Sequence, residues 1–217
     1  MPYRTIKQWP NKSLSFIAEA ASPVEIQEVS ADLIDTLRVA AGAGLAAPQI
    51  GISKRVFVID TARFDCDNPD QEKGDKNFWI VANPKLSNEA GEWKWQEACL
   101  SVPLVKCMVT RYETLTLEYD DINGESSTID LVAPLSLAVQ HEADHLDGKT
   151  ILDRISKLTA NIYKRKIRKS ILKSMRAMRE LEKSDEPVVG RPKKKSHLSA
   201  QEKKKRKKTR LRNLRKN

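Results

Sequence analysis

The feature that most constrains the fold of this 217-residue chain is a pair of histidines separated by three residues, in the pattern HExxH. The pattern comprises His141, Glu142 and His145. On a helix, residues four positions apart lie on one face, so both imidazoles can bind one metal ion while the glutamate reaches a water molecule on it. Two ordinary core or surface histidines are the alternative, but the chain has only three histidines, and two of them have this spacing. The motif therefore predicts a metal site on a helix between Pro134 and Gly148.

A catalytic metal site needs a third protein ligand and an open coordination position. The remaining histidine, His197, lies among the lysines of the C-terminal tail, and Ile151 stands where a longer metalloprotease motif requires a histidine. The nearest downstream glutamates, Glu180 and Glu182, belong to a strongly basic segment. The residues alone therefore leave a cysteine or a carboxylate from the first 153 residues as the third ligand.

The chain has three cysteines, an odd and sparse set that argues against a disulfide scaffold and for a reducing compartment. Cys66 stands between two aspartates, which disfavour a thiolate. Cys107 has the pattern of a half-buried strand residue. Cys99 lies where a strand meets Val102-Pro103, so its thiolate could face the helix, or it could be a small buried apolar residue.

The net charge changes sign along the chain. Residues 1–153 carry 14 basic and 24 acidic side chains, residues 154–183 carry 11 and 2, and residues 184–217 carry 14 and 3. We therefore expect a catalytic body over 1–153, a basic amphipathic helix over 154–183 and a disordered basic tail over 184–217. This asymmetry favours contact between the C-terminal third and nucleic acid or another anionic surface.

The body has the patterns of both helices and strands. Ser22-Pro23 predicts the start of a helix that ends near Gly42. Strands are expected over residues 55–59, 78–82, 92–96, 114–119 and 129–132. Asn83-Pro84 should end the second of these, and the turn at Asn123-Gly124 should join the last two. Trp93 and Trp95 are expected to fill the core.

Short strands followed by one buried helix indicate an α+β fold with mainly antiparallel sheets around a central metal-binding helix, a C-terminal helix and a disordered basic tail. Apolar residues recur at helical spacings between Ile155 and Leu181 among lysines and arginines, which predicts the C-terminal helix. No run of 18 uncharged apolar residues occurs, so we expect no transmembrane helix. The N-terminus lacks the pattern of a signal peptide, which favours a cytoplasmic protein.

Three segments, in order, resemble the motifs of the peptide deformylase family. The family pattern GxGxAAxQ matches residues 42–49, EGCLS matches residues 97–101 with Ala98 in place of glycine, and QHExDHLxG matches residues 140–148. The resemblance extends from about residue 1 to 180. It implies a metal-dependent hydrolase that removes the formyl group from the N-terminal formylmethionine of newly made polypeptides and releases formate.

The resemblance also implies roles for individual residues. Glu142 would be the general base toward a metal-bound water, which is the nucleophile. Gln49 and the backbone N–H of Leu100 would stabilise the negative charge on the formyl oxygen. The metal would be one divalent ion, most often iron(II) in the family, although the ligand set also suits zinc, nickel or cobalt. The implied metal ligands are Cys99, His141 and His145.

The resemblance further implies a set of substrate-binding residues around this site. Glu97 would bond near the metal, and Arg111 would lie behind it unless it is a surface charge at a strand end. The methyl group of Ala98 would narrow the substrate cleft or shift a peptide-binding carbonyl. Leu137 and Ala138 lie one helical turn before the first histidine and would line the pocket for the methionine side chain. The full set is Gly42, Ala43, Gly44, Leu45, Glu97, Ala98, Leu137 and Ala138.

The C-terminal third is expected to bind ribosomal RNA, because it is strongly basic beside an acidic body. The resemblance adds that family members generally end in a helix proposed to dock on the ribosome, and Ile155 to Leu181 resembles a longer, more basic version of it. No aromatic residue follows Tyr163, so phosphate contacts rather than base stacking would provide the affinity. A solubilising tail, a nuclear address and an anionic membrane surface are the alternatives. The predicted contact residues are Lys203, Lys204, Lys205, Arg206, Lys207 and Lys208.

A protein of another class would show some of the same features. It would be an RNA- or ribosome-binding protein in which the metal site is purely structural. A structural site is closed by a fourth protein ligand, and no fourth ligand is evident in the sequence.

Overall fold

The computed structural model describes residues 3–64, 67–70 and 77–185. Cys66 and the predicted RNA contacts at residues 203–208 lie outside the described residues, as does the tail predicted to be disordered. The chain divides into two compact units, Met1–Ile171 and Leu172–Asn217. The three-part division that we drew from charge stays a prediction.

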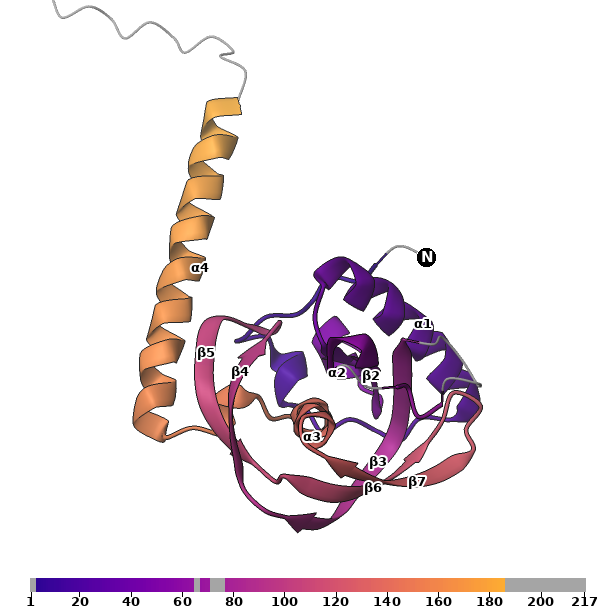
Figure 1. The fold of residues 1–217 in the computed structure, drawn as a ribbon. Coiled ribbons are helices and arrows are strands. Elements are labelled where there is room, and N and C mark those ends of the chain that lie inside the picture. The colour runs from indigo at the N-terminus through magenta and orange to yellow at the C-terminus, as the bar shows by residue number, and fades with distance from the viewer. Residues whose placement is uncertain (1–2, 65–66, 71–76, 186–217) are drawn as a thin grey trace, which may run out of the picture. The chain divides into compact units, whose positions relative to one another are not determined.

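The first unit contains two antiparallel sheets and three of the four helices in full (Figure 1). The larger sheet has five strands in the order β1-β2-β3-β6-β7, and the smaller is the hairpin β4-β5. The strands are β1 Gly44–Ala46, β2 Val56–Asp60, β3 Phe78–Ala90, β4 Trp93–Cys99, β5 Val102–Arg111, β6 Thr114–Asp120 and β7 Ser126–Val132. The α-helices are α1 Pro23–Ala40, α2 Ala47–Ile50, α3 Leu135–Leu146 and α4 Lys157–Asp185, and 3-10 turns occupy Lys12–Ser15, Thr61–Phe64 and Ile151–Asp153. This is the mixed helix and antiparallel-sheet fold predicted from the sequence.

Helix α1 begins and ends where its sequence signals predict. The Ser22 side chain accepts from the backbone N–H of Glu25, and the Glu25 carboxylate accepts from Ser22 in return, which is a capping box ahead of Pro23. Ala41 adopts the left-handed conformation, with φ of 53°, and ends the helix one residue before Gly42. Because both termini are satisfied locally, this helix is well specified by its own sequence.

The five-stranded sheet is covered by helices on both faces. Val56 and Val58 of β2 belong to an apolar cluster with Leu33 of α1. Phe57, which alternates with them along the strand, belongs to a second cluster with Val139 of α3. The unbroken apolar run of β2 therefore reflects a strand buried on both sides.

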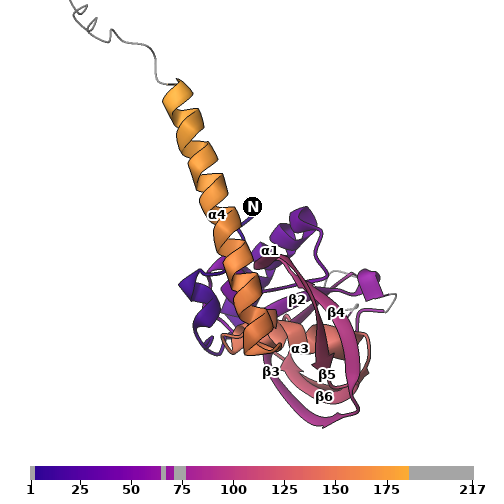
Figure 2. The same cartoon turned by 90° about the vertical axis from the view of Figure 1, so that its left-hand side faces the viewer.

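Helix α3 lies at the centre of the first unit. Figure 1 shows it end-on, above the larger sheet and beside the β4-β5 hairpin, and in Figure 2 it lies behind that hairpin. Most of its residues are buried. The helix predicted from the HExxH motif is therefore present, with Pro134 as its N-cap residue.

The start of α4 packs on the body. Ala160 and Ile167 are buried in a third cluster with Val105 and Val109 of β5, and Tyr163 packs against it. The predicted basic amphipathic helix is confirmed as a helix that extends from Lys157 to Asp185. None of the described helices is long and apolar enough to cross a membrane.

Strand β3 contradicts the predicted stop at Asn83-Pro84. It continues to Ala90, with a shift in its register to β6 between Ala82 and Lys85. Asn83 has a positive φ of 47° at this irregularity, and its side chain donates to the Ala21 carbonyl. A local bulge accommodates the proline, which has no N–H to donate, so the strand bends without ending.

The expectation that Trp93 and Trp95 fill the core is wrong, because the two residues are 41% and 43% exposed. In the hairpin register they pair with Arg111 and Val109, whose side chains are buried. Cross-strand partners lie on the same face of the hairpin, so that face is covered over β5 but only partly covered over β4. Alternation along a strand determines the face on which a side chain lies, but not how completely that face is covered at each position.

Candidate active site

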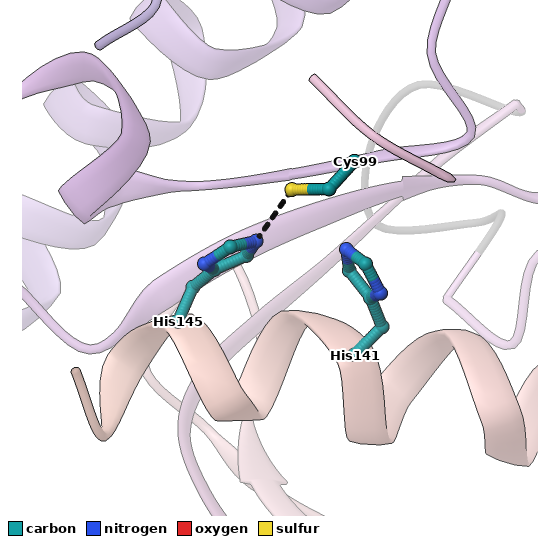
Figure 3. Close-up of side chains that lie close together, drawn as sticks. All are labelled: Cys99, His141 and His145. Carbon is teal, nitrogen blue, oxygen red and sulfur yellow. Dashed lines mark hydrogen bonds between the residues drawn. The ribbon is translucent and has the colours of Figure 1, made fainter. Parts of the chain in front are cut away.

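Two histidines of α3 and one cysteine of β4 converge on a common point (Figure 3). One ligand atom from each of Cys99, His141 and His145 can be chosen so that all three lie within 4.8 Å of one another. The Cys99 Sγ lies 3.2 Å from Nε2 of His145. Cys107 is also buried in the hairpin, but it pairs with Glu97 and is not a member of this group. The structure thus brings together the three residues that the resemblance implied as ligands.

The donor set fits a divalent metal ion. Three atoms that each lie about 2.0–2.3 Å from one ion in tetrahedral geometry are roughly 3.5 Å apart, which is close to the 3.2 Å between Cys99 Sγ and His145 Nε2. Burial alone would raise the pKa of the Cys99 thiol, but the charge of His145 and hydrogen bonds from both imidazoles hold that pKa well below its usual value. The sulfur therefore favours the anionic form that binds metals.

Glu142 follows His141 on α3 and is buried. Burial raises the pKa of its carboxyl group above the ordinary value. Within the part of the chain that the structure describes, its Oε2 atom has no hydrogen-bond partner. The carboxylate lines a cavity of about 550 Å³ together with Cys99 and His141. Glu142 is thus available to exchange a proton with a molecule in that cavity.

The amide of Gln49 points at the cluster from α2. Its Oε1 atom accepts a 2.7 Å hydrogen bond from the backbone N–H of Ala46. The amide nitrogen must then face the other way, where it lies 3.7 Å from Cys99 Sγ and 3.2 Å from Ser101 Oγ. Ser101 is fully buried, and we did not single it out from the sequence, although it belongs to the Cys99 motif. Together these contacts orient an N–H donor toward the cavity.

Behind the cluster, His141 is held by a buried ion pair. Its Nδ1 atom lies 2.7 Å from Oε2 of Glu97. Arg111 donates to both oxygens of Glu97, at 2.6 and 3.0 Å, and is 5% exposed rather than a surface charge. Burial opposes ionisation of Glu97, but hydrogen bonds from His141 and Arg111 lower its pKa to about 2. This anchor orients His141 so that Nε2 faces the cluster, as second-layer carboxylates do for metal-binding histidines.

The cavity collects most of the predicted substrate-binding set, namely Gly42, Ala43, Gly44, Glu97, Ala98, Leu137 and Ala138, together with Leu100. Leu45 requires correction, because it does not line the cavity and is fully buried in the core beside α1. Its side chain lies on the opposite face of β1 from those of its neighbours.

Several cavity-lining residues were missed by our reading of the sequence. Arg63, Phe64, Trp95 and Pro134 all contribute to the wall. Trp95 could have been found, because it is two residues before Glu97 and therefore on the same face of the strand. Arg63 and Phe64 come from a 3-10 turn distant in sequence from every motif.

The Cys/His/His donor set lies beside a buried glutamate and borders a cavity lined partly by apolar side chains. In an α+β fold, this arrangement defines a metal-dependent hydrolase. The family model described as polypeptide deformylase matches residues 3–161. The chain belongs to the polypeptide deformylase family.

Individual relatives agree with this assignment. The chain is 36% identical over 148 residues to the peptide deformylase of Desulfotalea psychrophila, a match that covers 68% of this chain and 83% of that protein. It is 33% identical over 165 residues to that of Thermodesulfovibrio yellowstonii, covering 75% and 95%. The solved peptide deformylase of Legionella pneumophila is similar, with a TM-score of 0.69 at 33% identity, over 81% of this chain and 98% of that one.

Proposed function

We propose that the deformylase activity of this chain takes place in the cavity between β1, β4 and α3, where Cys99, His141 and His145 hold one divalent metal ion. The observation that carries this proposal is the convergence of the three ligand atoms beside Glu142, within a cavity of about 550 Å³. Iron(II) is the first expectation for the metal, and zinc, nickel and cobalt also suit two imidazoles and a thiolate. A divalent ion bound there would lower the pKa of a water molecule to about 7 and polarise the formyl oxygen.

We expect groups of the protein itself to carry out the remaining steps of the reaction. Glu142 accepts a proton from the attacking water and delivers it to the amine nitrogen as the C–N bond of the formamide breaks. Formate and a free amino terminus are the products. The amide of Gln49 and the backbone N–H of Leu100 donate to the oxygen that gains negative charge during the attack. The orientation of the Gln49 amide, fixed by Ala46, supports this role.

The proposed substrate is a peptide that begins with N-formylmethionine. Leu137, Phe64 and Trp95 give the cavity an apolar wall that suits the methionine side chain. A solved structure of the Acinetobacter baumannii peptide deformylase is described as bound to Met-Ala-Ser, and this tripeptide supplies a probe for the present chain. The methyl group of Ala98 projects from the β4 strand that borders the same cavity.

Formate release from formyl-Met-Ala-Ser by the full-length, metal-loaded chain tests the proposed function. We expect formate and Met-Ala-Ser in equal amounts, with no release of acetate from acetyl-Met-Ala-Ser and loss of turnover after chelation. A metal-loaded chain that releases no formate would contradict the proposal. The alternative of a binding protein with a structural metal site is not favoured, because the family is enzymatic and the cluster borders an accessible cavity.

We further propose that the C-terminal third binds ribosomal RNA in the cytoplasm. Residues 154–183 carry 11 basic and 2 acidic side chains, and residues 184–217 carry 14 and 3. Binding through phosphate contacts should fall steeply with salt and show little sequence preference.

Truncation after Glu182 removes the contacts predicted at residues 203–208 and leaves the catalytic body intact. We expect unchanged turnover on formyl-Met-Ala-Ser and reduced co-sedimentation with ribosomes at about 50 mM salt. Equal sedimentation of the full-length and truncated chains would contradict this proposal.

A further inference from the structure

A second cavity, of about 480 Å³, lies against the other face of α3. The substrate cavity is bordered by residues 137, 138, 141 and 142 of this helix, whereas residues 140, 143, 144 and 147 border the second one. These two sets fall on different sides of an α-helix. The wall of the second cavity includes Arg111, Asp144 and Arg154. One of these residues, Arg111, also holds the anchor of His141.

A continuous chain of ion pairs runs from this cavity to the proposed metal ligand. Arg154 donates from Nε to Asp144 at 2.8 Å, and its Nη2 atom contacts the other oxygen of the same carboxylate. Arg111 donates from Nη1 to Asp144, also at 2.8 Å. The same guanidinium donates from Nε and Nη2 to the two oxygens of Glu97, and Glu97 is hydrogen-bonded to Nδ1 of His141. Each link is a charge-assisted hydrogen bond, the stronger kind in proteins.

When His141 is a neutral metal ligand, the charges in this row of ion pairs balance only if Arg154 is included. Glu97 and Asp144 are two carboxylates, and Arg111 alone would have to satisfy both. The side chains of Arg111, Asp144 and Glu97 are 2%, 5% and 6% exposed, whereas that of Arg154 is 43% exposed. Arg154 is therefore the member of this row of ion pairs that reaches solvent. Its loss would leave the buried carboxylate of Asp144 without one of its two partners. Removal of one partner from a buried ion pair leaves the other charge undercompensated, so Arg111 would then have to satisfy Asp144 as well as Glu97.

We propose that Arg154 is a positioning residue for the metal centre, acting through Asp144, Arg111 and Glu97 on the orientation of His141. By satisfying one side of Asp144, Arg154 leaves the Arg111 guanidinium free to bind Glu97 with two parallel hydrogen bonds. Glu97 in turn sets the plane of the His141 ring. This inference rests on the proposed ligand set. It adds a positioning residue, Arg154, from the segment between Ile151–Asp153 and α4.

The second cavity also provides a matched control. Arg55 lines the same wall and pairs with Asp147 at 3.0 Å, near the end of α3. Asp147 is not part of the chain of contacts that leads to His141. Substitution of Arg55 therefore removes a comparable cation and ion pair beside the same helix, without breaking the connection to the metal ligand.

Binding of cobalt(II) to the full-length chain tests the proposal. The parent, Arg154→Ala, Arg154→Gln, Arg154→Lys and Arg55→Ala proteins are compared by competition with a chelator, and the visible spectrum reports the geometry around cobalt. Thermal unfolding of each metal-free protein shows that it is folded. Loss of a residue that orients a metal ligand typically costs ~10–100-fold in affinity, and we expect about tenfold for the alanine and glutamine variants because Arg154 acts at a distance.

The expected pattern has three parts. Arg154→Ala and Arg154→Gln weaken cobalt binding and alter the spectrum, and they lower kcat at saturating metal with little change in KM. Arg154→Lys recovers part of the affinity, because it restores the charge but not the planar fork of a guanidinium. Arg55→Ala stays within about twofold of the parent, well below the ~10-fold loss expected for a residue that orients a metal ligand.

Two results would overturn the proposal. The first is a folded Arg154→Gln protein that binds cobalt as the parent does, and the second is an equal loss of affinity in Arg55→Ala. A parent protein whose cobalt spectrum lacks a thiolate contribution would instead overturn the ligand set itself. The failure of this inference is thus distinguishable from failure of the proposed function.

Discussion

Gly44 lies directly against the carboxylate of Glu142. A β-carbon on Gly44 would be 2.5 Å from Oε1 and 2.9 Å from Cδ of Glu142, distances too short for any side chain. Gly44 is not among the residues with positive φ, so its role is to permit this approach and not to permit an unusual backbone conformation. The small-residue run before Gln49 therefore makes room for the proposed general base.

Replacement of Gly44 by alanine should impair turnover without removing the metal. The added methyl group displaces the Glu142 carboxylate, and misplacement of a catalytic group by about 1 Å can cost on the order of 100-fold in rate. We expect kcat for formyl-Met-Ala-Ser to fall by about 10- to 100-fold, while cobalt affinity stays near that of the parent. An alanine variant with parental kcat would show that Glu142 does not need its present position.

Replacement of Cys99 by serine should weaken metal binding, because only the thiolate supplies an anionic sulfur ligand. Cys107→Ser is the matched control, since Cys107 is buried in the same hairpin but lies outside the metal cluster. Cys66→Ser should also retain metal. Metal content after gel filtration distinguishes these variants. Full metal content in Cys99→Ser would instead favour a carboxylate as the third ligand.

Acid should destabilise the fold in part through Glu25 at the start of α1. Its carboxylate accepts from the Ser22 N–H at 2.8 Å and pairs with Lys54 at 2.9 Å. The hydrogen bonds from Ser22, followed by that from Lys54, lower its pKa from 4.5 to about 2. A lowered pKa means that this stabilisation is present above about pH 4.5 and is lost as the pH falls toward 2.

The corresponding variant is Glu25→Gln, which cannot titrate. Urea unfolding of the metal-free protein at pH 5 and pH 3 should show a smaller loss of stability on acidification for this variant than for the parent. Glu28→Gln, at an exposed position on the same helix, is the control. Equal acid sensitivity in the parent and Glu25→Gln proteins would show that this cap does not contribute to the pH dependence.

The features that were predictable from the sequence depend on contacts between near neighbours. The cap at Ser22, the end of α1 near Gly42 and the placement of His141 and His145 on one face of α3 all arise within a few residues. Helical periodicity and capping chemistry are sufficient to specify such features. The approach of Cys99 to the helix required knowledge of the family motif, because 46 residues separate it from His145.

The features that were missed depend on tertiary packing. Asn83 makes a strand irregularity possible because it bonds to Ala21, 62 residues away. Trp95 alternates correctly with its neighbours, yet it lies over a cavity that only the folded chain creates. Arg111 could equally have been a surface charge until Asp144 and Glu97 were brought to it. The local sequence pattern does not indicate which residue a buried charged side chain will pair with in the fold.

The most direct test of the proposed active site measures bound metal and formate release on one sample of the Glu142→Gln protein. The substitution removes a proton acceptor that lines the cavity but is not one of the three proposed metal ligands. If Glu142 is the general base, the variant binds one metal ion per chain, as the parent does, and its turnover on formyl-Met-Ala-Ser is reduced by about 10²–10⁴-fold. A metal-loaded Glu142→Gln protein with near-parental turnover would contradict this role.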